Sequence, residues 1–134
     1  MGFGTFTSGD WSAYTTSRGY SASSTVSDMY KATAVKPSME PKGIRFRESC
    51  DSLEHPDSTP IILGLDVTGS MGRVLEIVSK KLNTLLLQIY DREPVKDPQV
   101  MIMAFGDAEC DSYPLQVSQF ESDIRIAKQL NDVY

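Results

Sequence analysis

The chain has 134 residues, of which 40% are hydrophobic and 23% are charged, and this fits one soluble globular domain at most. Its net charge of −5 argues against a nucleic-acid groove or an anionic membrane surface as the main partner. No apolar run is long enough for a membrane helix, and the first residues lack the pattern of a signal peptide. We therefore expect a cytoplasmic protein whose two cysteines, Cys50 and Cys110, stay reduced.

Residues 1–58 show no sustained apolar rhythm. Ser, Thr, Gly and Tyr dominate as far as Tyr30, and several X-Pro pairs that stop helices come next. Only Ile44-Arg45-Phe46-Arg47 has the composition of a short strand. This pattern predicts an extended arm with little structure of its own. Its aromatic residues can anchor it on its own domain or on a partner.

A strongly patterned sequence begins at Pro60. The continuous apolar run Ile61–Leu65 predicts a strand that is covered on both faces, as in a parallel sheet. A glycine-containing turn follows the run. Apolar residues then recur at helical spacing and predict a helix from about residue 71 to residue 91, with an apolar face that suits packing on a sheet.

Two further strands and a helix complete the pattern. Val100–Phe105 predicts a second buried strand, and Tyr113–Val117 predicts a short edge strand, because its proline cannot donate to a ladder. Ser118 and Glu121 have the spacing of a capping box, which predicts that the last helix begins there. This order predicts an α/β fold with a Rossmann-like, three-layer parallel sheet over residues 59–134. No closing strand follows the last helix, so we expect only the first half of such a domain.

The segment Asp66-Val67-Thr68-Gly69-Ser70 carries the candidate chemistry. It follows the first strand directly, at the carboxyl end, where open α/β sheets bind ligands. A tight turn can point Asp66, Thr68 and Ser70 to one side. A carboxylate and two hydroxyls suit Mg²⁺ or Mn²⁺ better than zinc. One carboxylate does not neutralise a divalent ion, so the site would keep waters or accept an acidic group from outside.

This segment resembles the Asp-x-Ser/Thr-x-Ser signature of von Willebrand factor A (VWA) domains, where it forms the metal-ion-dependent adhesion site, or MIDAS. The strand before it, the helix after it and the strand ending at Phe105-Gly106-Asp107 are similar to that family in order and spacing over about residues 60–134. The resemblance implies that Asp66, Thr68 and Ser70 are metal-site residues. It also implies that the ion recognises a carboxylate on a protein partner. The family completes its site with a Thr and an Asp from two further loops, which this chain lacks.

Two alternatives remain beside the metal-dependent interaction module, which is the favoured hypothesis. A bare Asp-x-Thr-x-Ser pattern is also compatible with an ordinary helix entrance that Thr68 or Ser70 caps. The segment also resembles the Asp-Lys-Thr-Gly-Thr motif of phosphorylated ATPases of the haloacid-dehalogenase class. In that enzyme hypothesis Asp66 would be the nucleophile that takes a phosphoryl group, Thr68 would hold the group, and Asp107 and Asp111 would hold Mg²⁺.

The predicted strand Ile61–Leu65 has a consequence for association. In the family's sheet this strand is central and lies next to a strand that the chain lacks. The missing neighbour would leave an unpaired and very apolar edge. We therefore expect the chain to self-associate through this edge, or the edge to be covered by the chain's own arm or by the remainder of the protein.

Overall fold

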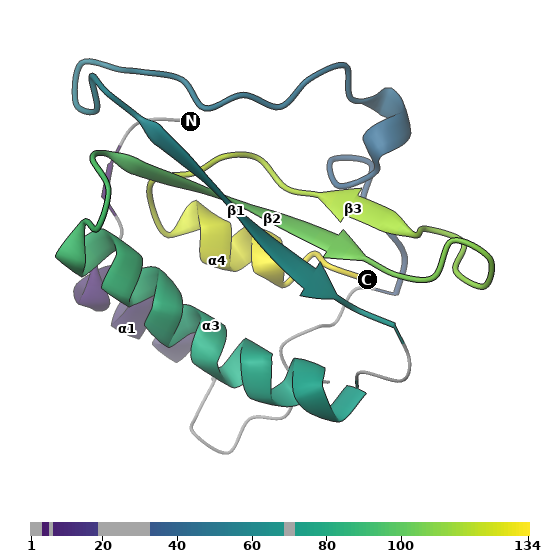
Figure 1. Ribbon diagram of the computed structural model, residues 1–134. Coiled ribbons are helices and arrows are strands. Elements are labelled where there is room, and N and C mark those ends of the chain that lie inside the picture. Colours follow the sequence, from purple (N-terminus) through teal and green to yellow (C-terminus); the bar gives the residue numbers. More distant parts are fainter. Residues whose placement is uncertain (1–3, 6, 19–32, 69–71) are drawn as a thin grey trace.

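The computed structural model describes residues 4–5, 7–18, 33–68 and 72–134, and within residues 72–80 and at residue 83 it describes the backbone alone. These residues form a small mixed α/β protein (Figure 1). Its three-stranded sheet has the order β1-β2-β3, with β1 at Thr59–Asp66, β2 at Pro98–Phe105 and β3 at Leu115–Val117. All three strands lie where the sequence predicted them.

The sheet is mixed and not purely parallel. Strands β1 and β2 run parallel, as predicted, but β3 is antiparallel to β2. The chain connects β2 to β3 through a short loop over residues 106–114, and a loop of that length can only join antiparallel neighbours. A parallel pair needs a crossover, which the long helix between β1 and β2 supplies.

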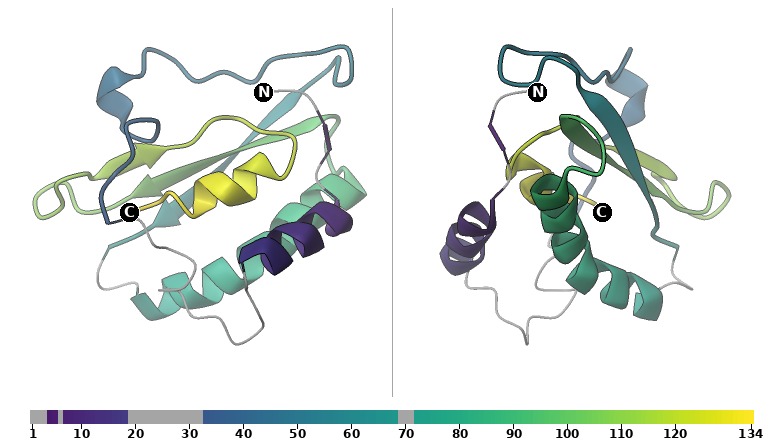
Figure 2. Two further views of the ribbon diagram at one scale, coloured as in Figure 1. Left: turned by 180° about the vertical axis from the view of Figure 1, so that it is seen from behind. Right: turned by 60° about the vertical axis from the view of Figure 1, so that its left-hand side comes forward.

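The helices gather on one side of the sheet. Within the part of the chain that the structure describes they are α1 (Ser8–Arg18), α3 (Gly72–Arg92) and α4 (Arg125–Leu130), and a 3₁₀ turn, η1, lies at Pro41–Gly43. Helices α3 and α4 pack against the sheet, and α1 lies on their far side (Figure 2). Within the described ranges no helix covers the opposite face, so the predicted three-layer arrangement is not seen there.

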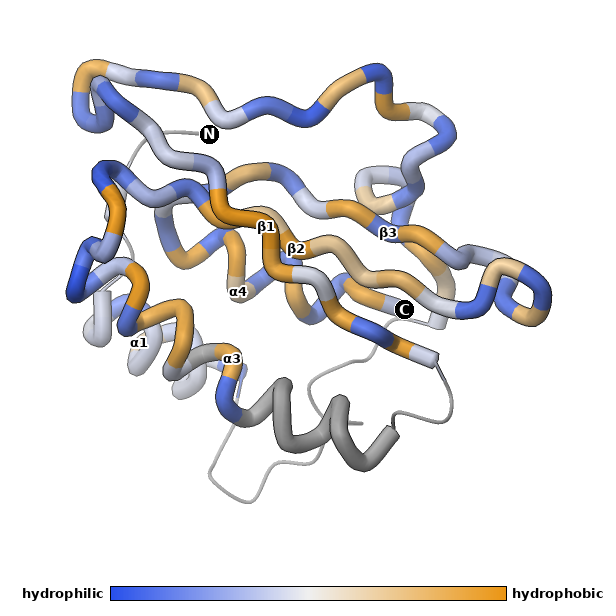
Figure 3. Tube along the Cα trace, in the orientation of Figure 1, coloured by the Kyte–Doolittle hydropathy of each residue, from blue (hydrophilic) through white to orange (hydrophobic). Residues whose placement is uncertain are grey.

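The hydrophobic core lies between the sheet and the helices. The parallel register sets Ile61 beside Val100 and Leu65 beside Ala104, and these side chains point towards the helices. Helix α3 contributes buried residues at helical spacing, among them Leu86, which is fully buried. Figure 3 shows the apolar residues concentrated along β1, β2 and the helix segments beneath them. The apolar periodicity of residues 71–91 predicted this helix, and Met71 itself lies outside the described residues.

The segment before residue 59 is more ordered than the extended arm predicted from the sequence. Residues 8–18 form α1, and the Tyr14 side chain of this helix is buried in the core. Residues 33–58 run along the sheet without strand structure, so Ile44–Arg47 is not a strand. They are fastened by the fully buried Gln99 of β2, whose side-chain amide hydrogen-bonds the N–H and C=O of Cys50.

The last helix begins later than the capping-box spacing predicted. The Ser118 hydroxyl accepts the Ile102 N–H at 2.9 Å, so it serves β2 and not a helix. Glu121 exchanges two backbone hydrogen bonds with Val100, both at 2.9 Å, which continues the antiparallel pairing along β2. Helix α4 therefore starts only at Arg125.

The structure also bears on the expected state of the cysteines and on membrane-spanning helices. Both cysteines are free, Cys50 half-buried and Cys110 exposed. Among the described residues, no helix is long and apolar enough to cross a lipid bilayer.

Candidate functional site

The turn after β1 brings two of the predicted site residues together. The Val67 N–H still donates to the Phe105 carbonyl at 2.9 Å, which extends the parallel pairing by one residue. The chain then bends, and Oδ1 of Asp66 accepts both the Thr68 backbone N–H at 2.9 Å and the Thr68 hydroxyl at 2.7 Å. Aspartate favours such turns because its short side chain can bond the backbone two residues ahead. Ser70, the third predicted site residue, lies outside the described residues.

The hydrogen bonds of this turn favour an ionised carboxylate. The Thr68 backbone N–H and then the Thr68 hydroxyl lower the pKa of Asp66, and partial burial opposes them only weakly. Both hydrogen bonds converge on Oδ1, and Oδ2 accepts none from the part of the chain that the structure describes. The turn therefore holds a charged carboxylate beside a hydroxyl, with one carboxylate oxygen available to a cation.

The described residues leave the ordinary helix-entrance interpretation open. The Thr68 hydroxyl donates to Asp66, and a hydroxyl that donates can also accept an N–H from a first helical turn. The residues between Thr68 and Gly72, Ser70 among them, lie outside the described residues.

The loop after β2 lies at the same end of the sheet and is closed on itself. Asp111 accepts the Asp107 N–H through Oδ2 at 2.6 Å and donates its own N–H to the Asp107 carbonyl at 2.9 Å. The Asp107 carboxylate accepts the Glu109 N–H at 2.8 Å, and this bond is the main reason why the pKa of Asp107 is lowered. A Cβ at Gly106 would lie 2.3 Å from Asp111 Oδ2, so a larger residue there would have to displace this carboxylate.

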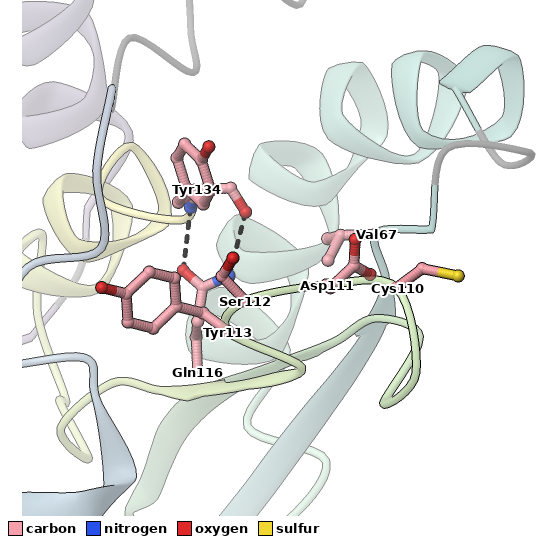
Figure 4. A pocket seen from close by; sticks show the side chains of 7 residues that line it. All are labelled: Val67, Cys110, Asp111, Ser112, Tyr113, Gln116 and Tyr134. Carbon is pink, nitrogen blue, oxygen red and sulfur yellow. Dashed lines mark hydrogen bonds between the residues drawn. The ribbon is translucent and has the colours of Figure 1, made fainter.

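A pocket of about 230 Å³ opens between the two turns (Figure 4). Val67 lines it from the β1 side, and the opposite wall comes from the loop after β2 together with Gln116 and Tyr134. The buried Gln116 amide donates to the Tyr134 carbonyl at 2.9 Å and accepts the Tyr134 N–H at 2.8 Å. Ligands of an open α/β sheet bind at this end of the strands.

The carboxylates of the phosphoryl-transfer hypothesis lie on two turns. Asp107 and Asp111 lie together on the loop after β2, and Asp66 lies on the turn after β1. Among the described residues no three acidic, histidine or cysteine side chains are close enough to share a metal ion.

Sequence reasoning missed the pairing of Gln116 with Tyr134. The two residues are 18 positions apart and neither belongs to a local motif, so nothing in the sequence pointed to them. The only available signal was a polar residue inside the apolar strand pattern of residues 115–117, because a buried amide needs partners.

Comparison with known proteins adds no relative. No family model, no curated protein and no solved structure matches the chain.

Proposed function

We propose that the chain is part of a metal-dependent protein-interaction module of the VWA type, built on an incomplete Rossmann-like sheet. A Mg²⁺ or Mn²⁺ ion bound by Asp66, Thr68 and Ser70 recognises a carboxylate that a protein partner supplies. The observation that carries the proposal is the turn at the carboxyl end of β1, where the Asp66 carboxylate and the Thr68 hydroxyl lie 2.7 Å apart.

The donor set of this turn fits a hard cation. Carboxylate and hydroxyl oxygens are the ligands that Mg²⁺ and Mn²⁺ prefer, and the lowered pKa of Asp66 keeps its carboxylate charged. With a single carboxylate, the turn supplies less negative charge than a divalent ion carries. The surplus positive charge is what would attract an acidic group from a partner. The order strand, helix, strand, short strand and helix, observed over residues 59–130, agrees with the resemblance drawn from the motif.

Titration with Mn²⁺, followed by electron paramagnetic resonance, tests the metal site. We expect the wild-type chain to bind Mn²⁺ and Asp66→Ala to weaken binding about tenfold or more, since even indirect supports of a metal ligand are worth that much. Asp107→Asn, on the neighbouring loop, is the matched control and should bind Mn²⁺ like the wild type. Equal binding by wild type and Asp66→Ala would refute the site.

The carboxylate-recognition step needs its own test. Acetate should displace a coordinated water from the bound Mn²⁺ and so lower the water-proton relaxation that the ion causes.

The phosphoryl-transfer hypothesis makes the opposite set of predictions. It requires Mg²⁺-dependent binding of beryllofluoride and a loss of metal in Asp107→Asn, and either result would replace the interaction module by an enzyme.

A further inference from the structure

The outer edge of β1 is open over the middle of the strand. Strand β1 is an edge strand of the sheet and pairs on one side with β2. The Thr59 N–H donates to the Asp97 carbonyl at 3.1 Å, and the Val67 N–H donates to the Phe105 carbonyl. The backbone N–H and C=O groups of the odd-numbered residues of β1 therefore point towards β2. In a strand the backbone groups alternate in direction, so the even-numbered residues face away from the sheet.

Ile62 and Gly64 are the even-numbered residues at the centre of this edge. Their outward N–H and C=O groups have no partner among the residues that the structure describes. Both residues are exposed, and Ile62 keeps 52% of its surface accessible. Proteins protect such edges with proline, charge or bulges. Here protection is limited to the two ends of the strand, at Pro60 and Asp66.

The opposite edge of the sheet is shorter and partly covered, which distinguishes it from β1. Strand β3 has only three residues and follows Pro114. The outward N–H of Val117 donates to the Met39 carbonyl at 2.9 Å, so the segment before β1 covers that edge.

We propose that β1 pairs with β1 of a second copy of this chain, antiparallel and related by a two-fold axis at Leu63. In this register Ile62 faces Gly64 of the second copy, and each pair exchanges two backbone hydrogen bonds. The same surface serves both copies, as a two-fold interface requires. The two three-stranded sheets join into one continuous sheet.

The side chains fit this register. The large Ile62 lies beside a glycine, which leaves room for it. On the same sheet face Phe105 and Leu115 remain 43% and 39% exposed, so an apolar strip continues from the edge across the sheet. Asp66 is the only charged residue of β1, and it faces Pro60 of the second copy. No like charges meet, and the Asp66 N–H faces the carbonyl of a proline that has no N–H of its own.

Amide hydrogen exchange combined with sedimentation tests the pairing on the full chain. We expect a dimer whose Ile62 and Gly64 N–H groups exchange slowly at high concentration and rapidly on dilution. The Ile61 and Leu63 N–H groups, which face β2, should stay protected at both concentrations. Protection of Ile62 and Gly64 in a sedimenting monomer would instead show that another segment of the chain covers the edge, and rapid exchange at high concentration would show that nothing pairs with it. Both results overturn the proposal.

A pair of matched variants distinguishes strand-edge pairing from nonspecific association through the apolar face of the sheet. Ile62→Lys places a charge on the open edge and should raise the dimer dissociation constant about tenfold or more, as expected for a contact at the centre of an interface. Leu115→Lys makes a comparable change on the same sheet face but at the opposite edge, and it should leave the dissociation constant nearly unchanged. Equal effects of the two variants would mean that the apolar face, and not the strand edge, drives association.

Discussion

At the scale of single residues, Gly106 shapes the loop beside the candidate metal site. A Cβ atom there would lie 2.3 Å from Oδ2 of Asp111, which is far inside van der Waals contact. That oxygen accepts the Asp107 N–H at 2.6 Å, so the carboxylate cannot move without breaking the bond that closes the loop. Glycine therefore leaves room for the Asp111 carboxylate, which a larger residue would have to displace.

We predict that Gly106→Ala lowers the melting temperature by about 4 °C, because the new methyl group displaces the Asp111 carboxylate from the Asp107 N–H. Gly43→Ala is the control, since a Cβ at Gly43 would meet no atom within 4 Å. Thermal unfolding followed by circular dichroism measures both variants. If the double variant Gly106→Ala with Asp111→Ala melts well below Asp111→Ala alone, the clash lies elsewhere.

The candidate site was only partly predictable at this scale. The alternate positions of Asp66 and Thr68 after an apolar strand predicted that their oxygens lie on one side of a turn, and the structure has them in hydrogen-bond contact. The direction of that hydrogen bond follows from chemistry, because an ionised carboxylate only accepts. The additional bond from the Thr68 backbone N–H to the same oxygen was not predictable, because it depends on backbone angles. The Gln116–Tyr134 pair could not be predicted from the sequence for a different reason, because tertiary packing alone brings these two residues together.

At the scale of elements, two segments with the spacing of a capping box form different structures: one begins a helix and the other pairs with a strand. Thr7-x-x-Asp10 is a capping box that went unnoticed, and the Thr7 hydroxyl accepts the Asp10 N–H at 3.1 Å as α1 begins. Ser118-x-x-Glu121 has the same spacing but pairs with β2. The difference is physical: residues 118–121 lie beside an open ladder of β2, which offers more backbone hydrogen bonds than one helix cap. Helix α1 was missed because its sequence is largely polar, so apolar periodicity could not reveal it.

Gln99 joins the segment before β1 to the sheet, and the oxygen and the nitrogen of its side-chain amide each make two hydrogen bonds. It accepts the Ser49 hydroxyl and the Cys50 N–H, and it donates to the Cys50 carbonyl and the Ser58 hydroxyl, over distances of 2.8–3.2 Å. We predict that Gln99→Leu lowers the free energy of unfolding by about 2 kcal/mol, because it leaves the N–H and C=O of Cys50 unpaired against an apolar side chain.

Urea denaturation measures this loss, and hydrogen exchange at the Cys50 amide locates it. The matched control is Gln88→Leu, which makes the same replacement on the exposed side of α3 and should change the stability by less than about 0.5 kcal/mol. Unchanged exchange at Cys50 in Gln99→Leu would mean that other contacts hold the segment in place.

At the scale of the whole molecule, the local patterns predicted the elements better than their assembly. Continuous apolar runs predicted β1 and β2, and the crossover helix between them required a parallel pair. The boundary at residue 58 marks a change in composition, but not a limit of the core. Tyr14 and Met39, from before that boundary, are 6% and 1% exposed and pack with the strand and helix residues that follow it. Composition alone did not show this, because isolated buried residues in a polar segment form no period.

The charge of the whole chain distinguishes edge pairing from a metal-bridged assembly. Each copy carries a net charge of −5, so two copies repel each other, and salt screens that repulsion. We predict that raising sodium chloride from about 0.05 M to about 0.5 M tightens the dimer in sedimentation, because its contacts are backbone hydrogen bonds and apolar surface. Removing divalent ions with EDTA should leave the dimer unchanged. A dimer that EDTA dissolves and that Asp66→Ala prevents would instead use the metal site of one copy to bind a carboxylate of the other.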